Sequence, residues 1–278
     1  LPEVTRTFIH PGMGDEGLAT GAALLKCFQL CERQQQPFDR NPITDVYWGP
    51  QFSNHEVERE LDSFGMPYEY HENIENQVAG LLARGKMVAR FAGRMEYGPR
   101  ALGNRSILYH PGDTSVNEWL NKRLKRTEFM PFAPVTAKEF ANQCYTGLLG
   151  AELPAKFMTI TTDCTDEMAA HCPAVVHVDG TARPQVVDEE DNPRYYQIVD
   201  EYRKRTGVPA LINTSFNMHE EPIVCTPNDA LRAFRDGSLD YLAIENFLVK
   251  GESASWWGEC PFYQSFFQPL KLVYFPNT

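Results

Sequence analysis

The segment Gly93–Ser106 limits the possible fold more than any other part of the chain. Gly93, Gly98 and Gly103 recur at every fifth position, and Pro99 follows the second of them. Glycine adopts backbone conformations that other residues avoid and lets other groups approach the main chain, so this spacing is typical of a loop. Residues 86–91 alternate as a strand does. We therefore predict a strand that leads directly into a glycine-rich loop with exposed N–H groups.

Three arginines, Arg94, Arg100 and Arg105, are interleaved with these glycines. A guanidinium group can hold two oxygens of a phosphate or carboxyphosphate at once, which favours an anion site on the loop. The alternative is a loop held together by arginine–carboxylate pairs, with Glu96 as a partner. The segment lacks the Gly-x-x-x-x-Gly-Lys-Ser/Thr pattern of a P-loop, so that motif gives no support for nucleotide binding.

The charge of the chain is distributed unevenly. Residues 84–126 carry ten Lys and Arg against three Asp and Glu, whereas the whole chain has a net charge of −11. Nucleic-acid-binding surfaces are usually basic, so the acidic total disfavours that function. A basic region inside an acidic protein instead indicates a small bound anion.

Three further segments place polar side chains directly after an apolar element. A predicted helix ends in cations at residues 122–126, where the negative end of the helix dipole favours them. Predicted strands at 174–178 and 208–213 lead into the polar stretches 177–185 and 213–217. Each segment has an ordinary alternative, either a solvated helix end or a capped turn. Together with the glycine-rich loop, however, they predict one ligand site built from four polar loops.

The composition is that of a globular protein, with 42% hydrophobic and 23% charged residues. No apolar run approaches the roughly 20 residues of a membrane span, and no signal peptide is visible at the start. Seven cysteines are scattered along the chain and never form Cys-x-x-Cys, which argues against a disulfide framework or a zinc ribbon. We expect buried, reduced thiols in a cytoplasmic protein.

Hydrophobic periodicity predicts strands and helices in alternation. Capping boxes at Ser53–Glu56 and Ser115–Glu118 mark two helix starts, and Thr226 with Pro227 marks a third. This alternation indicates an α/β (α+β) fold with a mixed sheet. We expect helices over residues 18–33, 53–64, 74–84, 115–124, 195–205 and 227–235, and strands over 7–9, 43–48, 86–91, 174–178, 208–213 and 240–249.

The chain divides into three predicted regions. Residues 1–42 hold one strand, a glycine-rich turn and a helix, too little to form a core, so we interpret them as the last βα element of a preceding domain and a linker. Residues 43–251 form the main domain. Residues 252–278 form an aromatic-rich tail that either packs on the surface or meets a partner. Because the chain begins with Leu1 rather than Met, we expect it to be part of a longer protein.

The segments 93–108, 126–134, 177–185 and 213–227 together resemble the NodU/CmcH-type O-carbamoyltransferases, and the similarity extends over about residues 1–250. The resemblance implies a YrdC-like domain, a twisted mixed sheet with flanking helices, preceded by the terminal βα element of an ASKHA-like domain. In that family the YrdC-like half is understood to form carbamoyl-adenylate from carbamoyl phosphate and ATP, for which we expect Mg²⁺. The carbamoyl group then passes to a hydroxyl of a small-molecule acceptor in the ASKHA-like half, a biosynthetic reaction.

The resemblance also implies roles for individual residues. The YrdC-type Lys-x-Arg pair is incomplete, because Leu124 stands two residues before Arg126, so Lys122 or Lys125 would take the place of the lysine. The implied catalytic residues are Arg100, Arg105, Arg126, Ser215 and Asn217. The implied substrate-binding residues are Arg94, Glu96, Gly98, Pro99, Ser106, Lys122, Lys125, His177, Asp179, Arg183, Gln185, Asn213 and Thr214.

The stretch His10–Gly17 resembles the closing motif of the ASKHA-like half, in which Asp15 is a candidate metal ligand. The partner histidines would lie upstream of Leu1, so we expect Fe or another divalent metal only in that upstream part.

Two other functions stay open at this point. One is a YrdC-like threonylcarbamoyl-adenylate synthase for tRNA modification, and the other is a non-enzymatic nucleotide- or RNA-binding module. The motif at residues 10–17 disfavours the first, and the acidic charge disfavours both. We expect small-molecule substrates and an upstream ASKHA-like domain as partners, and neither nucleic acid nor membrane. The sequence leaves a homodimer open and does not identify the acceptor.

Overall fold

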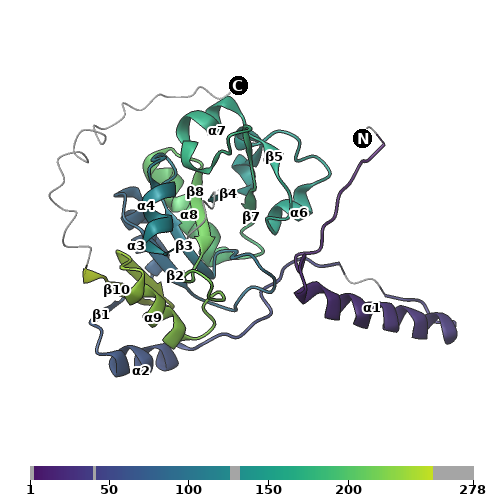
Figure 1. The fold of residues 1–278 in the computed structure, drawn as a ribbon, viewed down its shortest axis with the longest axis horizontal. Coiled ribbons are helices and arrows are strands. Elements are labelled where there is room, and N and C mark those ends of the chain that lie inside the picture. Colours follow the sequence, from purple (N-terminus) through teal and green to yellow (C-terminus); the bar gives the residue numbers. More distant parts are fainter. Residues whose placement is uncertain (1–2, 40–41, 126–131, 253–278) are drawn as a thin grey trace.

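The computed structural model describes residues 3–39, 42–125 and 132–252. Most of these residues form one α/β body around a single large sheet, and helix α1 (Glu16–Arg33) stands apart from it (Figure 1). The strand order in this sheet is β1-β10-β9-β2-β3-β8-β4-β7. The pairs β2–β9 and β4–β7 are parallel and the others antiparallel, so the predicted mixed sheet is confirmed.

The strand bounds follow from the hydrogen-bond ladders of two sheets. The large sheet contains β1 (Tyr68–Tyr70), β2 (Val88–Phe91), β3 (Arg105–Tyr109), β4 (Ala133–Ala137), β7 (Gln185–Val187), β8 (Ala210–Ser215), β9 (Tyr241–Ile244) and β10 (Phe247–Lys250). A separate two-stranded sheet pairs β5 (Thr162–Asp163) with β6 (Thr181–Ala182).

Helices cover both faces of the large sheet. Successive residues of a strand point to opposite faces, so Ile107 and Leu108 of β3 enter different cores. Leu108 packs with helices α3 (Ile74–Ala83) and α8 (Pro193–Thr206). Ile107 packs with α2 (Asn54–Phe64), α4 (Val116–Arg123) and α9 (Pro227–Asp236). The short helices α5 (Ala141–Cys144), α6 (Glu152–Lys156) and α7 (Asp166–His171) complete the body.

The sequence predicted several helix starts correctly. Ser53 adopts an extended backbone and exchanges hydrogen bonds with Glu56, which confirms the capping box of α2. Thr226 forms the equivalent box with Asp229 at α9. The box predicted at Ser115 was wrong, because Ser115 has helical backbone angles and caps nothing. Its backbone N–H instead donates to the carboxylate of Asp113, 2.9 Å away, so the turn begins further upstream.

Four predicted strands differ from the structure. Residues 7–9 and 43–48 form no strand, although the Thr7 N–H donates to the Gly150 carbonyl at 2.8 Å. Residues 173–175 form a 3₁₀ helix that begins at Pro173, which has no N–H for a strand ladder. The stretch 240–249 divides into β9 and β10 because a tight turn at Glu245, with φ 47°, reverses the chain.

Helix α1 has no buried residue, and its amphipathic pattern leaves Leu18 and Leu25 more than half exposed. The described cysteines are free thiols. Burial raises the pKa of Cys144 to about 12 and that of Cys164 to about 11, which keeps both thiols protonated. In the described ranges no helix is long and apolar enough to cross a membrane. The tail beyond Glu252 lies outside the described residues.

Candidate functional site

The glycine-rich segment forms a loop over Gly93–Asn104, which we call the arginine loop. The last two residues of the segment, Arg105 and Ser106, belong to β3. Two buried amide side chains hold the loop against the sheet. Asn213 Nδ2 donates to the Ala101 carbonyl at 3.1 Å and to Gln185 Oε1 at 2.7 Å. Gln185 Nε2 donates to the Leu102 carbonyl at 2.8 Å. This amide network joins strands β7 and β8 to the loop beside Arg100.

Arg100 and Arg183 come from distant parts of the sequence and lie within electrostatic range of each other. Arg100 precedes the pinned Ala101, and Arg183 lies two residues before Gln185. Both guanidinium groups are partly buried, and both Nε atoms are buried without a hydrogen-bond partner. Neither arginine forms an ion pair within the described residues. Burial and, to a smaller extent, the charge of Arg100 together lower the pKa of Arg183 to about 10. Burial also lowers the pKa of Arg100, while Glu16 favours its charged form.

Two partly buried cations that lack a carboxylate partner within the described chain make a candidate site for an anion. Burying an uncompensated charge costs free energy, and each cation also repels the other. An anion with several oxygens would offset both costs, since guanidinium groups bind such oxygens in pairs. Arg183 therefore belongs with Arg100, although the sequence motif that contains it gave only a moderate signal.

Glu96 and Arg105 serve the loop itself in this structure. One carboxylate oxygen of Glu96, Oε1, accepts the backbone N–H groups of Leu102, Asn104 and Arg105, at 2.7, 2.8 and 3.2 Å. The guanidinium of Arg105 is fully buried and stacks on Phe91, with 3.7 Å from Cζ to the ring centre.

Arg105 also donates hydrogen bonds to four main-chain carbonyls. The acceptors are Ala92, Asn104, Pro50 and Gly93, at 2.8 to 3.3 Å. Burial lowers the pKa of Arg105 to about 10, and Glu96 opposes that shift. The alternative interpretation of the sequence expected arginine–carboxylate pairs with Glu96 as a partner. Glu96 and Arg105 do hold this end of the loop, but each does so through hydrogen bonds to the main chain and not by pairing with the other. The expectation that Arg105 contacts the substrate is not supported by its contacts.

Arg94 likewise bonds the main chain, donating to the carbonyls of Trp48 at 2.6 Å and Gly49 at 3.2 Å. Ser106 Oγ accepts the Gly103 N–H at 2.9 Å. Both residues therefore shape the arginine loop. Gly98 and Pro99 precede Arg100 directly, and Gly98 has φ 105°, a conformation that favours glycine.

The turn after β8 lies at the same end of the sheet as the loop. Ser215 pairs with Ser106 in the β3–β8 ladder, and the Phe216 N–H donates to the Arg105 carbonyl at 3.0 Å. Ser215 Oγ donates to Asn217 Oδ1 at 2.6 Å, so the Ser-x-Asn pair is internally bonded. Thr214 precedes this pair on β8 and is half-buried.

The remaining predicted residues lie around this centre. The His219 N–H donates to the Leu124 carbonyl at 3.1 Å, which brings the end of α4 to the Ser-x-Asn turn. Lys122 and Lys125 are exposed there, and Arg126 lies outside the described residues. His177 and Asp179 bond mainly to Thr181 within one turn, which favours the capped-turn interpretation for both.

Asp15 is exposed at the start of α1. Among the described residues no group of three or more His, Cys, Asp or Glu is placed to hold a metal ion.

The sequence analysis did not identify Arg90 and Glu245, two residues that bond to the arginine loop. Arg90 on β2 donates to the Gly103 carbonyl at 2.6 Å and to Asn104 Oδ1 at 2.7 Å. Glu245 accepts the Gly93 N–H at 2.7 Å and pairs with Arg194 at 2.8 Å. A charged residue inside the otherwise apolar run 87–91 was the available signal for Arg90, since buried charges need partners.

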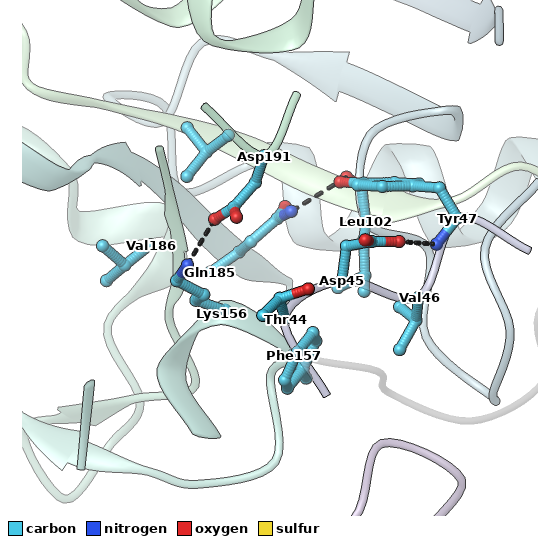
Figure 2. Close-up of a pocket in the computed structure, with 11 residues that line it drawn as sticks. Thr44, Asp45, Val46, Tyr47, Leu102, Lys156, Phe157, Gln185, Val186 and Asp191 are labelled. Atoms are coloured by element: carbon cyan, nitrogen blue, oxygen red, sulfur yellow. Dashed lines mark hydrogen bonds and ion pairs between the residues drawn. The ribbon is translucent and has the colours of Figure 1, made fainter. Parts of the chain in front are cut away.

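A small cavity lies beside the amide network, and Leu102 and Gln185 of the network line it. Figure 2 shows Gln185 reaching Leu102 and Lys156 pairing with Asp191 across it. None of the arginines lines this cavity, and its only lining cation, Lys156, is already paired at 2.5 Å. It is therefore separate from the candidate anion site.

Comparison with known proteins shows several similarities. The family model described as carbamoyltransferase C-terminus matches residues 79–251. An uncharacterized protein of Methanocaldococcus jannaschii is 40% identical over 252 residues, which cover 87% of this chain and 40% of that protein. Nodulation protein NolNO of Sinorhizobium fredii is 38% identical over 89% of this chain and 36% of its own length. Nodulation protein NolO of Bradyrhizobium diazoefficiens is 37% identical over 89% and 45%.

The chain thus spans less than half the length of these relatives. Among solved structures, full-length HypF in a phosphate- and nucleotide-bound form matches with a TM-score of 0.41 and 18% identity, covering 66% of this chain and 22% of that one.

Proposed function

The chain belongs to the carbamoyltransferase family, and from this premise we propose that it uses ATP to convert carbamoyl phosphate to carbamoyl-adenylate. The carbamoyl group would then pass to a hydroxyl of a small-molecule acceptor. Because the chain spans less than half of its relatives, the acceptor site and the transfer step belong to the proposal for the whole protein.

The observation that carries this proposal is the unpaired arginine pair. Arg100 and Arg183 lie within electrostatic range of each other, and no anion from the described part of the chain pairs with either. Other buried arginines, such as Arg90 and Arg105, have protein acceptors. A ligand rich in negative oxygens, such as a polyphosphate, would supply what Arg100 and Arg183 lack.

The proposed reaction makes charge stabilisation the main task of the site. Carbamoyl phosphate, ATP and water give carbamoyl-adenylate, pyrophosphate and phosphate. Water first cleaves the bond between the phosphorus of carbamoyl phosphate and its bridging oxygen, which gives phosphate and carbamate. A carbamate oxygen then forms the new bond to the α-phosphorus of ATP, and the bond from that phosphorus to pyrophosphate breaks. Negative charge grows on the leaving pyrophosphate, where fixed guanidinium groups stabilise it without exchanging protons. Mg²⁺ would be held largely by the ATP phosphates, as is usual for this ion.

The polar turns supply hydrogen-bonding groups for the carbamoyl end. Ser215 and Asn217 stand at the end of β8, beside the residues that close the arginine loop. A hydroxyl and an amide can bond the oxygen and the N–H₂ of a planar carbamoyl group. We assign substrate contact to Arg100, Arg183, Ser215 and Asn217. Glu96 and Arg105 would instead keep the loop in shape.

The test is calorimetric binding of ATP and of carbamoyl phosphate to the chain, with pyrophosphate release measured in parallel. Arg100→Ala should weaken ATP binding by about tenfold or more, because it removes a charge-assisted contact. Arg235→Ala is the matched control, since Arg235 is exposed and pairs only with its neighbour Asp236.

Equal effects of the two substitutions would show that the loop is not the site. Binding of neither ligand to a folded chain would overturn the proposal. Pyrophosphate release that requires threonine and bicarbonate, and not carbamoyl phosphate, would favour a threonylcarbamoyl-adenylate synthase instead.

A further inference from the structure

A second contact surface of the arginine loop faces the N-terminal segment. Gly98 of the loop lies against Pro11, so closely that a Cβ atom at Gly98 would be 2.8 Å from the Pro11 carbonyl oxygen. Pro11 and Gly12 are both buried, although the helix that follows them is not. The segment 10–20 therefore packs against the arginine loop, and its contact at Gly98 is only two residues from Arg100.

Tyr97 lies at the centre of this contact between the loop and segment 10–20. Its hydroxyl donates to the Glu16 carbonyl at 2.9 Å and lies 3.2 Å from Thr20 Oγ1. Its ring stacks on Trp48, with 5.3 Å between ring centres. A tyrosine fixed by both its ring and its hydroxyl has little freedom. These contacts join the loop beside Arg100 to the segment 10–20.

Arg100 also interacts electrostatically with segment 10–20. Glu16 favours the charged form of Arg100, although the two side chains form no ion pair. The position of the first turn of α1 thus influences both the backbone and the charge of the loop.

We propose that Tyr97 is a positioning residue that couples the seating of segment 10–20 to the anion-binding geometry of Arg100. The inference rests on the proposed function, because it acts through Arg100. When segment 10–20 is packed against the loop, Tyr97 holds Gly98–Arg100 in place. The side chain of Arg100 is then oriented before a ligand binds. Preorganised groups bind more tightly because less order is lost on binding. Movement of α1 would then change the affinity of the anion site.

The most direct test displaces Tyr97 by a substitution in segment 10–20. A Cβ atom at Gly12 would lie 2.9 Å from Tyr97 Cζ, so Gly12→Ala must displace the tyrosine ring. Gly21→Ala is the matched control, since its Cβ would meet nothing within 4 Å. We expect Gly12→Ala to weaken ATP binding by about threefold to tenfold, as loss of one hydrogen bond does, and Gly21→Ala to leave it unchanged.

A second variant separates positioning from general damage. Tyr97→Phe removes the bond to the Glu16 carbonyl and should weaken ATP binding to a similar extent. In an Arg100→Lys background the same change should have almost no effect, because a positioning residue acts through the residue that it positions. Thermal unfolding of each variant checks that the fold is kept, and Tyr97→Phe suffices if Gly12→Ala does not fold.

The outcomes distinguish this inference from the proposed function. If Arg100→Ala leaves ATP binding intact, the proposed function fails. If Arg100→Ala abolishes binding while Gly12→Ala and Tyr97→Phe bind like the wild type, only the positioning role of Tyr97 fails. Equal losses from Tyr97→Phe with and without Arg100→Lys would also overturn it, since the effect would not pass through Arg100.

Discussion

Arg100 and Arg105 stand five residues apart on one segment, and the structure gives them opposite surroundings. Arg105 is fully buried, stacks on Phe91 and donates to four carbonyls, while Glu96 supports the same turn. Arg100 is partly buried and donates no side-chain hydrogen bond within the described chain, whereas in Arg105 only the Nε lacks an acceptor. Since the side chains are chemically identical, the difference lies in which acceptors the fold supplies. A saturated arginine stabilises the loop, and an unsaturated one is available to a ligand.

Removing the saturated arginine should have the largest effect on stability. Arg105→Ala leaves a cavity beside Phe91 and several carbonyls without a donor. We expect the free energy of unfolding to fall by about 3–5 kcal/mol, the cost of breaking a buried charged network. Urea unfolding of Arg105→Ala beside Arg84→Ala, an exposed control, measures this. A loss below about 1 kcal/mol would mean that Arg105 is not structural.

A side chain at Gly103, at the end of the arginine loop next to β3, should also destabilise the fold. Its φ is 113°, and a Cβ atom there would lie 2.6 Å from Cγ of the buried Tyr195 ring. Backbone strain and overpacking together predict a loss of about 3 kcal/mol for Gly103→Ala. Gly80→Ala, in the middle of α3, is the control, because its Cβ would make only an ordinary contact. Thermal melts of the two variants that coincide would refute the steric argument.

The unsaturated pair should behave in the opposite way. Arg183→Met removes a cation that Arg100 repels, and it removes no hydrogen bond within the described chain. We expect ATP affinity to fall by about tenfold, while the free energy of unfolding stays the same or rises. Calorimetry and urea unfolding on the same sample test both halves. A stability loss above about 2 kcal/mol would place Arg183 with Arg105 instead.

This contrast also explains what the sequence could and could not predict. The period of the glycines and the strand before them predicted the loop correctly, because both are local properties. The distinction between Arg100 and Arg105 depends on Pro50, Phe91 and Glu96, whose positions around the guanidinium follow only from tertiary packing. Arg183 and Arg100 are 83 residues apart in sequence, and only the tertiary fold, with the buried amides of the network, places them within electrostatic range of each other.

Helix starts show the same limit on a smaller scale. The patterns at Ser53 and Ser115 are alike in sequence, and only the first forms a capping box. Asp113 takes the backbone N–H of Ser115 and begins the turn earlier, so a neighbouring residue overrides the pattern. The sheet order is equally non-local, since β2 lies between β3, the next strand in the chain, and β9, which comes near the end of the domain.

A partly exposed ion pair sets the lower bound of the comparison, because water competes for the charge of its lysine. Lys138 and Asp188 pair at 2.5 Å, with the lysine side chain 63% exposed and the aspartate side chain 15% exposed. The pairing lowers the pKa of Asp188 from its ordinary value of 3.8. A carboxyl whose folded-state pKa is lowered contributes stability above its unfolded pKa and loses it as the pH falls through the folded value.

We therefore expect Asp188→Asn to cost only about 0.5 kcal/mol at neutral pH. The difference from the wild type should be constant above about pH 5 and shrink as the pH falls below that ordinary value, as urea unfolding across this range would measure. The control, Asp236→Asn, removes a partner that is 41% exposed and should change still less. A gap that grows in acid would mean that the carboxylate destabilises the fold. A loss as large as that of Arg105→Ala would remove the distinction between buried, saturated charges and surface pairs.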